Sequence, residues 1–221
     1  MATTVRESEP LSAEELEELP VFPLPRVVFF PGTLLPLHLF EPRYRRMAED
    51  CARGGPRAMA VALLAPGWEN DYEGRPPIHT MAGAGRIVAH EQLDDGTHDI
   101  LLQGVHRVQL DELAPGHRSY RRARASVVHD RGGASADEVQ ALWSCASAVA
   151  TFVRREHAEF ALGVVPTDGA ARVADVVTDR LVAPPDVRQR ILETVDVGHR
   201  VQLATEAVSK LLVSLQPGDQ N

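Results

Sequence analysis

Six prolines fall within the 26 residues from Leu19 to Tyr44, and they constrain the fold more than any other feature of the chain. Proline lacks a backbone N–H and fixes φ, so a stretch this rich in proline cannot be a helix. Most of its other residues are apolar, which indicates that both of its sides are buried. We therefore expect short strands with bends at the prolines. Pro31-Gly32 is interpreted as the turn between two strands, with Gly32 at positive φ.

The order of residues in this stretch carries a family resemblance. It contains L-P-V-F-P-L, then V-V-F-F-P-G, then L-P-L-H-L-F-E-P-R-Y. This order resembles the opening of the Lon N-terminal domain, the substrate-binding part of Lon proteases. A second block is similar to later strands of that family, and it consists of Gly85 to Val88, Asp95-Gly96 and the run Ile100 to Val108. The resemblance covers about residues 19–215 and is greatest to free-standing bacterial members without ATPase or protease domains.

The periodicity of the remaining chain separates strands from helices. The strands are predicted over Ala58–Leu64, Ala84–Gln92, Thr97–Gln103, Val105–Leu113 and Tyr120–His129. Gly104 lies between two apolar runs, which indicates a bulge or a sharp bend. From Asp137 the period becomes helical, with one apolar face that extends to His157. Three further helices are predicted over about Ala170–Val182, Pro185–Thr194 and Val197–Leu215.

These elements predict an α+β fold in two parts. We expect a flexible acidic N-terminus over residues 1–18, with a short capped helix at Ser12, and a small bent β-barrel-like part over 19–130. One helix of that part begins at Pro42 and packs on the sheet through Tyr44, Met47, Ala48 and Cys51. A linker over 131–136 and a C-terminal α-helical bundle over 137–216 follow. The resemblance to Lon implies the same arrangement, with a PUA-like barrel.

Charge and hydropathy exclude several classes of partner. The net charge of −8 disfavours nucleic acid, because phosphate binding needs a concentrated basic face. The densest basic cluster is Arg118, Arg121, Arg122 and Arg124. We interpret it as a solvated face, with a site for an acidic partner as the alternative. No apolar run is long enough to span a membrane and the N-terminus is acidic, so we expect a cytoplasmic protein.

Motifs for catalysis and for cofactors are absent from the sequence. It contains no P-loop, no G-x-S-x-G and no HExxH. Lys210 is the one lysine, and Ser209 beside it on a helix points elsewhere, which excludes the Ser-Lys dyad of the Lon proteolytic domain. Cys51 and Cys145 are expected to be small buried residues. His98 and His106 would face each other across strands without a third ligand, so we expect no metal and no cofactor.

Two hypotheses about function remain. The first is a non-enzymatic module that binds polypeptides, in unfolded or exposed apolar segments, or protein partners, as the resemblance to Lon implies. The second is a small hydrolase or transferase whose site is dispersed in the sequence, for example Asp71, Glu73 and His79. The first hypothesis involves no catalytic residue, no nucleic acid and no membrane, and it leaves weak self-association open.

Aromatic and arginine side chains mark the surface expected to bind polypeptide. The polar loop from Ala65 to Pro77 holds Trp68 and Tyr72, and aromatic residues in long loops are typical of binding surfaces. Alternatively, these two rings pack on the barrel as local staples. Phe40, Arg43 and Tyr44 lie where the proline-rich stretch ends. We nominate five contact residues: Phe40, Arg43, Tyr44, Trp68 and Tyr72.

Overall fold

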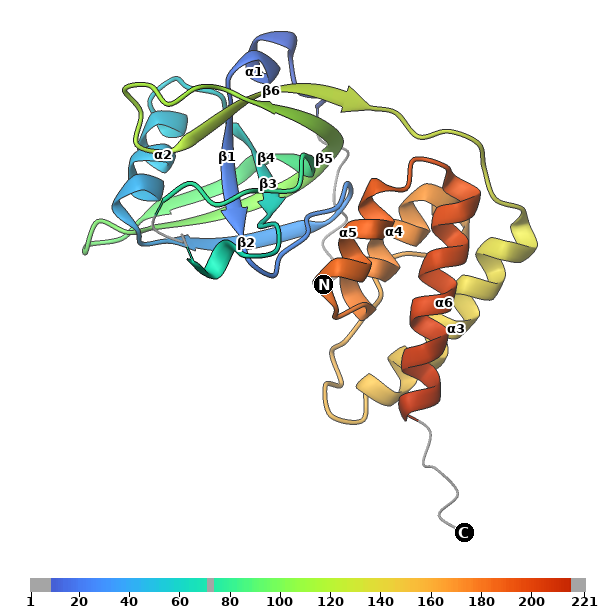
Figure 1. Ribbon diagram of the computed structural model, residues 1–221. Coiled ribbons are helices and arrows are strands. Elements are labelled where there is room, and N and C mark those ends of the chain that lie inside the picture. Colours follow the sequence, from blue (N-terminus) through green and yellow to red (C-terminus); the bar gives the residue numbers. More distant parts are fainter. Residues whose placement is uncertain (1–8, 71–73, 216–221) are drawn as a thin grey trace. The chain divides into compact units, whose positions relative to one another are not determined.

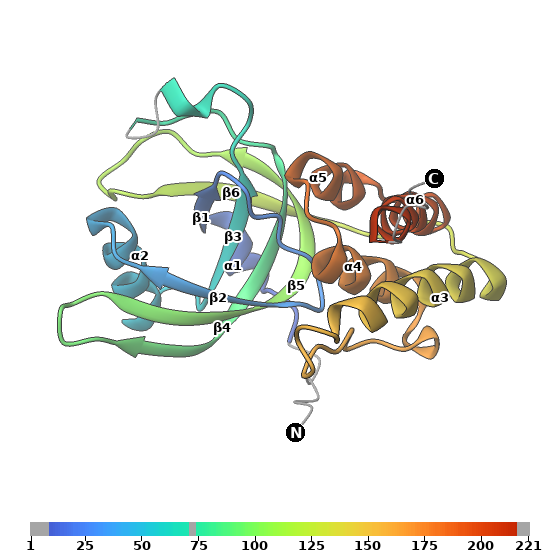
Figure 2. The same cartoon turned by 90° about the horizontal axis from the view of Figure 1, so that it is seen from below.

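The computed structural model describes residues 9–70 and 74–215 (Figures 1 and 2). The chain divides after Val128 into two compact units. The first, which we call the barrel unit, contains the strands and two α-helices. The second, the helical unit, contains the remaining α-helices. Each unit is described by itself.

The barrel unit is built on a sheet of six strands. They are β1 (Leu19–Leu24), β2 (Leu34–Leu39), β3 (Ala58–Leu63), β4 (Met81–Gln92), β5 (His98–Glu112) and β6 (Arg121–Val128). The strand order is β2-β5-β4-β3-β1-β6, and β6 also pairs with β5. Five strands therefore close into a barrel, and β2 extends it along the first half of β5. The predicted small, bent barrel is confirmed.

Glycines in β4 and β5 allow the chain between β1 and β2 to lie directly on the sheet. A Cβ at Gly83 would lie 2.0 Å from the carbonyl oxygen of Phe29, and one at Gly104 would lie 2.1 Å from that of Phe30. Phe29 and Phe30 are buried as a result. Gly32 has φ 76°, which confirms the predicted turn, and its N–H donates to the carbonyl of Gly104 at 2.9 Å.

Both faces of strand β3 are covered by apolar side chains. Ala58, Ala60 and Ala62 join a cluster to which β1, β4, β5 and β6 also contribute. Met59 and Val61, on the opposite face, pack in a second cluster with helix α2 (Pro42–Ala52). The side chains that α2 buries are Tyr44, Met47, Ala48 and Cys51, which confirms the predicted stripe. This explains why β3 is apolar without alternation.

Strand β5 corrects one expectation. We predicted two strands separated at Gly104, but β5 is continuous through this residue. Ala84 pairs with His106 and Gly85 with Gly104, so Val105 is an extra residue in β5. The irregularity predicted at Gly104 is thus a bulge. The prediction of two separate strands was wrong because a bulge bends a strand while its ladder with β4 continues.

The segment before β1 is more ordered than expected. Ser12 caps helix α1 (Ala13–Glu17) with the predicted capping box. Arg86 of β4 holds this segment: it donates to Glu15 at 2.8 Å and to the carbonyl of Glu9 at 2.8 Å. Residues 9–17, expected to be flexible, are therefore fixed to the barrel. Residues 1–8 lie outside the described part of the chain.

The helical unit consists of α3 (Ala136–Val153), α4 (Ala170–Leu181), α5 (Pro185–Glu193) and α6 (Val197–Leu215), with a short 3₁₀ helix, Pro166–Asp168, before α4. The predicted bundle is confirmed, with one correction: α3 ends at Val153, and His157 is exposed beyond it. Asp196 caps α6, accepting from the N–H of His199 at 2.8 Å. None of the described helices is long and apolar enough to cross a membrane.

A buried arginine connects the segments of the helical unit. The side chain of Arg200, on α6, has no exposed surface. It forms ion pairs with Asp130, which precedes α3, and with Asp175 of α4, the latter at 3.5 Å. Its Nε donates to the carbonyl of Thr194 at 2.9 Å. The chain before α3 is also attached to the start of α6, because the N–H of Val197 donates to the carbonyl of Arg131 at 2.9 Å.

Candidate functional site

The loop between β3 and β4 returns to its starting point. Its ends are joined by a bond from the N–H of Ala65 to the carbonyl of Pro77, 2.8 Å long, and by a bridge between Leu64 and Ile78. Within it, Trp68 begins a short 3₁₀ helix, Trp68–Asn70, and is partly exposed. The described end of this loop, residues 74–76, lines a pocket of the barrel unit.

This pocket has a volume of about 70 Å³, and we call it the arginine pocket. Its walls come from the end of β1, the first turn of α2, both ends of the loop and the segment that enters β6. The lining residues are Pro23, Arg43, Tyr44, Leu64, Gly74, Arg75, Pro76, Arg118, Ser119, Tyr120 and Arg121. Four of them are arginines and none is Asp or Glu. The described wall is therefore positively charged.

Arg43 and Tyr44 reach the pocket because Pro42 starts α2 beside it. Arg43 pairs with Glu41 at 2.8 Å, and its guanidinium lies over the Tyr44 ring at 4.8 Å from the ring centre. The Tyr44 ring packs edge-on against Phe22 at 4.4 Å. Tyr44 is only 4% exposed, so it contributes a wall of the pocket rather than a surface contact.

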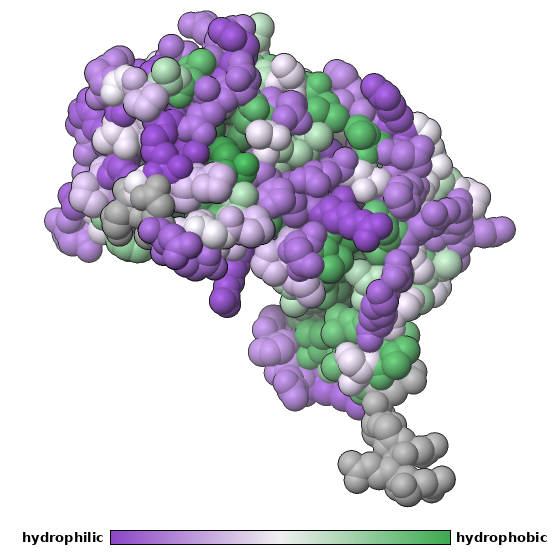
Figure 3. All heavy atoms as spheres, in the orientation of Figure 1, coloured by the Kyte–Doolittle hydropathy of each residue, from purple (hydrophilic) through white to green (hydrophobic). Residues whose placement is uncertain are grey.

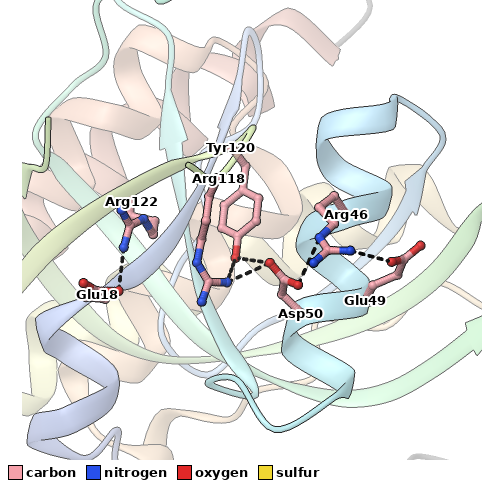
Figure 4. A network of polar contacts seen from close by, with 7 residues as sticks. All are labelled: Glu18, Arg46, Glu49, Asp50, Arg118, Tyr120 and Arg122. Atoms are coloured by element: carbon pink, nitrogen blue, oxygen red, sulfur yellow. Dashed lines mark hydrogen bonds and ion pairs between the residues drawn. The ribbon is translucent and has the colours of Figure 1, made fainter. Parts of the chain in front are cut away.

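Asp50 of α2 holds the second side of the pocket (Figure 4). It accepts from Arg118 at 2.7 Å and from the Tyr120 hydroxyl at 3.0 Å, and it pairs with Arg46 at 3.2 Å. Burial raises the pKa of Tyr120 to about 12, and the hydrogen bond to Asp50 also raises it. The phenol therefore stays protonated at neutral pH, as a donor to Asp50. Two cations, Arg46 and Arg118, share this one carboxylate.

Glu112 holds the third side. Its two oxygens accept from Arg121 at 3.0 and 2.7 Å, and Arg75 donates to the same carboxylate. Arg121 also donates to the carbonyl of Pro76 at 2.7 Å, which fixes the described end of the loop. Burial would raise the pKa of Glu112, but the hydrogen bonds from Arg121 and Arg75 hold it below its ordinary value. The carboxylate is thus ionised at neutral pH.

The four arginines of the pocket share three carboxylates, those of Glu41, Asp50 and Glu112. The rest of the predicted basic cluster lies apart from the pocket lining. Arg122 pairs with Glu18 at 2.5 Å and Arg124 with Glu17 at 2.9 Å. Arg122 and Arg124 are therefore each paired with a glutamate, whereas the described lining of the pocket holds four arginines and no Asp or Glu.

The structure brings together two of the five nominated contact residues, Arg43 and Tyr44. Phe40 lies after the end of β2, is 62% exposed, and is not part of the pocket lining. Trp68 lies earlier in the same loop and is not among the described lining residues. Tyr72 lies outside the described residues. The sequence pointed to Arg118 and Arg121 only as a basic cluster. Arg75 and Tyr120 were missed, since nothing in their local sequence marks them.

The dispersed catalytic site suggested by the sequence gains no support. Asp71 and Glu73 lie outside the described residues. Among those described, no group of three or more His, Cys, Asp or Glu is placed to hold a metal ion. His98 hydrogen-bonds His90 of β4 at 2.8 Å, not His106 as predicted, because His98 and His106 lie on the same continuous strand, β5. Burial raises the pKa of the Cys51 thiol to about 12, which removes it as a nucleophile at neutral pH.

The helical unit carries a larger and more apolar groove, with a volume of about 340 Å³. The segment joining α4 to α5 and the helices α5 and α6 form its walls. Apolar residues gather on this unit toward the end of α6 (Figure 3). The apolar lining residues are Leu181, Val182, Ala183, Pro184, Val187, Ile191, Leu203, Ala207 and Leu211.

A family model of the substrate-binding domain of ATP-dependent protease La (Lon) matches residues 18–210. The chain belongs to this family. Among its relatives, Lon protease 2 of Myxococcus xanthus is 27% identical over 196 residues, and Lon protease of Xanthomonas oryzae is 26% identical over the same length. Each alignment covers 87% of this chain and 23% of the relative. The chain thus spans about a quarter of the length of these Lon proteases.

Solved structures of Lon N-terminal domains share the fold. The N-terminal domain of the Mycobacterium avium complex Lon protease superposes with a TM-score of 0.64 at 15% identity, covering 87% of this chain and 98% of that one. The Lon N-terminal domain protein from Xanthomonas campestris gives 0.59 at 21% identity, over 90% and 99%. At these identities the likeness concerns the fold, and it confirms the two-part arrangement implied by the sequence.

Proposed function

We propose that this chain is a non-catalytic module that binds polypeptides, either unfolded chains or exposed apolar segments of protein partners. The observation that carries the proposal is the match to the substrate-binding domain of a protease over residues 18–210, because the substrates of a protease are polypeptides. The groove of the helical unit supports it, since an apolar lining suits the apolar side chains of an unfolded segment.

The barrel unit offers the contact surface that we nominate. Phe40 exposes 62% of its surface although Leu39 beside it is buried, and Arg43 follows at the start of α2. Trp68 presents a second partly exposed aromatic ring from the loop. Aromatic and arginine side chains contribute disproportionately to binding at interfaces. Tyr44 supports this surface from beneath, and Tyr72 stays a contact predicted from sequence.

Binding of an unfolded protein tests the proposal. The labelled ligand is a reduced and carboxymethylated polypeptide, which cannot refold, and fluorescence anisotropy measures its dissociation constant. We expect the double variant Phe40→Ala, Trp68→Ala to bind about tenfold more weakly, the loss typical of hot-spot residues. Its melting midpoint should stay within about two degrees of the wild type. Tyr72→Ala, measured alone, tests the remaining aromatic nomination.

Val88→Ala is the matched control, because Val88 is an apolar residue of β4 that is 47% exposed. This variant should bind the unfolded polypeptide as the wild type does. A double variant that loses stability and keeps its affinity would show that the rings of Phe40 and Trp68 stabilise the fold and do not bind the polypeptide. A wild-type protein that does not bind the unfolded polypeptide refutes the proposed function.

A further inference from the structure

We propose that the arginine pocket binds a carboxylate of the recognised polypeptide, supplied either by its C-terminus or by an Asp or Glu side chain. This inference rests on the proposed function, because the carboxylate belongs to the bound polypeptide. It adds a charged anchor to a recognition otherwise made by apolar contacts. The domain in this chain would then prefer polypeptides that present a carboxylate.

The hydrogen bonds of two arginines leave donors for such a ligand. A guanidinium has five N–H groups. Arg118 bonds Asp50 and Tyr120 through Nη1 alone, and Arg75 bonds Glu112 through Nη2 alone. Their side chains are 31% and 36% exposed, so both remain open to solvent. Arg121, by contrast, is 11% exposed and is used in holding Glu112 and Pro76.

The described lining of the pocket favours an anion. Four arginines line it, and the described lining contains no Asp or Glu. Glu41, Asp50 and Glu112 pair with these arginines from outside the lining. The exposed guanidinium groups of Arg75 and Arg118 would therefore attract an anionic group of the ligand.

The pocket has room for a small group. Its volume of about 70 Å³ exceeds the roughly 10–15 Å³ that one water molecule needs on the same measure, so a carboxylate can enter it. Leu64 and Pro23 add apolar surface for the carbon atoms next to it. Guanidinium groups bind carboxylates with paired hydrogen bonds, which makes this geometry selective.

A set of short acetylated peptides tests the inference. The peptides share one apolar sequence: the first ends in a free carboxylate, the second in an amide, and the third in an amide with one internal Glu. We expect the second to bind at least about tenfold more weakly than the first, the range of one charged hydrogen-bonded contact. If the third binds as tightly as the first, side-chain carboxylates also occupy the pocket. If it binds as weakly as the second, the pocket is specific for the C-terminus.

Arginine variants locate the effect. Arg75→Gln and Arg118→Gln should each remove most of the difference between the first and second peptides. Arg75→Gln keeps the fold intact, because Arg121 still holds Glu112 through two N–H groups. Arg124→Gln is the control: it removes a charge from β6 outside the pocket lining and should leave the difference unchanged.

Failure of this inference can be told from failure of the proposed function. If the first two peptides bind wild type with equal affinity, polypeptide binding stands and the carboxylate site is refuted. Equal preferences in wild type, Arg75→Gln and Arg118→Gln refute it as well, since the carboxylate would then bind elsewhere. If neither the peptides nor the unfolded polypeptide bind, the proposed function and this inference both fall.

Discussion

The variant Arg200→Met should strongly destabilise the helical unit. Arg200 is fully buried and compensates Asp130 and Asp175. Asp130 is 34% exposed and can be hydrated once the cation is removed, but Asp175 is 4% exposed and stays buried without its cation. Removing one partner of a buried ion pair costs about 3–5 kcal/mol. Because one of the two carboxylates is hydrated, we expect about 3 kcal/mol, at the lower end of that range.

Trp143 on α3 provides the assay. In a Trp68→Phe background it is the one remaining tryptophan of the chain, so its fluorescence during urea denaturation follows the helical unit alone. The free energy of unfolding in water should fall, while its slope against urea concentration should stay unchanged. Lys210→Met is the control, since Lys210 forms an exposed ion pair with Glu206, and it should change stability by less than about 0.5 kcal/mol.

A second variant separates loss of charge pairing from loss of packing. Arg200→Met with Asp175→Leu removes the buried anion together with its cation, and replacing a buried pair by apolar residues is often close to neutral. We expect this double variant to recover at least half of the lost stability. If Arg200→Met costs less than about 1 kcal/mol, or if the double variant is less stable than the single one, the buried charges are not what Arg200 stabilises.

Two further predictions concern the barrel unit. Gly32→Val should cost more than the ~1 kcal/mol of an ordinary point mutation, since φ at Gly32 is 76°, while Gly133→Ala, with open space around its position, is the control. An unchanged melting midpoint for Gly32→Val would contradict the strained turn. Burial, followed by the charge of His90, lowers the pKa of His98. Stability should therefore be highest above the unfolded-state pKa of about 6.5 and fall as the pH drops from there through the folded-state pKa, measured by urea denaturation from pH 7.5 to 5. The charge of nearby Glu49 raises the pKa of His98, and the charge of Arg45 lowers it. A flat profile, or a His98 signal titrating above pH 6.5 by NMR, would contradict it.

Local rules were sufficient for the elements whose signals lie within a few residues. Pro42 at the start of α2, the four-residue apolar stripe of that helix and the turn at Gly32 were all predictable, because capping, periodicity and positive φ are local properties. The bulge at Gly104 was predictable as an irregularity. Its form was not, since the number of residues opposite a bulge depends on the partner strand.

The arginine pocket could not be predicted because its lining residues extend from position 23 to 121 and meet only through the fold. The His90–His98 pair was missed because the sequence predicted two separate strands on either side of Gly104, which placed His98 opposite His106. The continuous strand β5 instead pairs with β4, which carries His90. The five contact residues and a cytoplasmic location stay predictions.

The closure of the barrel has a consequence for synthesis of the chain. Strand β1 pairs with β3 on one edge and with β6 on the other, where Val21 lies opposite Arg121. During translation, about 100 further residues must be synthesised after Val21 before Arg121 of β6 can pair with β1. One edge of strand β5 also lacks a partner along its second half until β6 is made. Unpaired edges pair readily with other chains. A nascent chain that stops before β6 therefore leaves an edge of β1 and an edge of β5 without a partner, so such a fragment should be prone to aggregate.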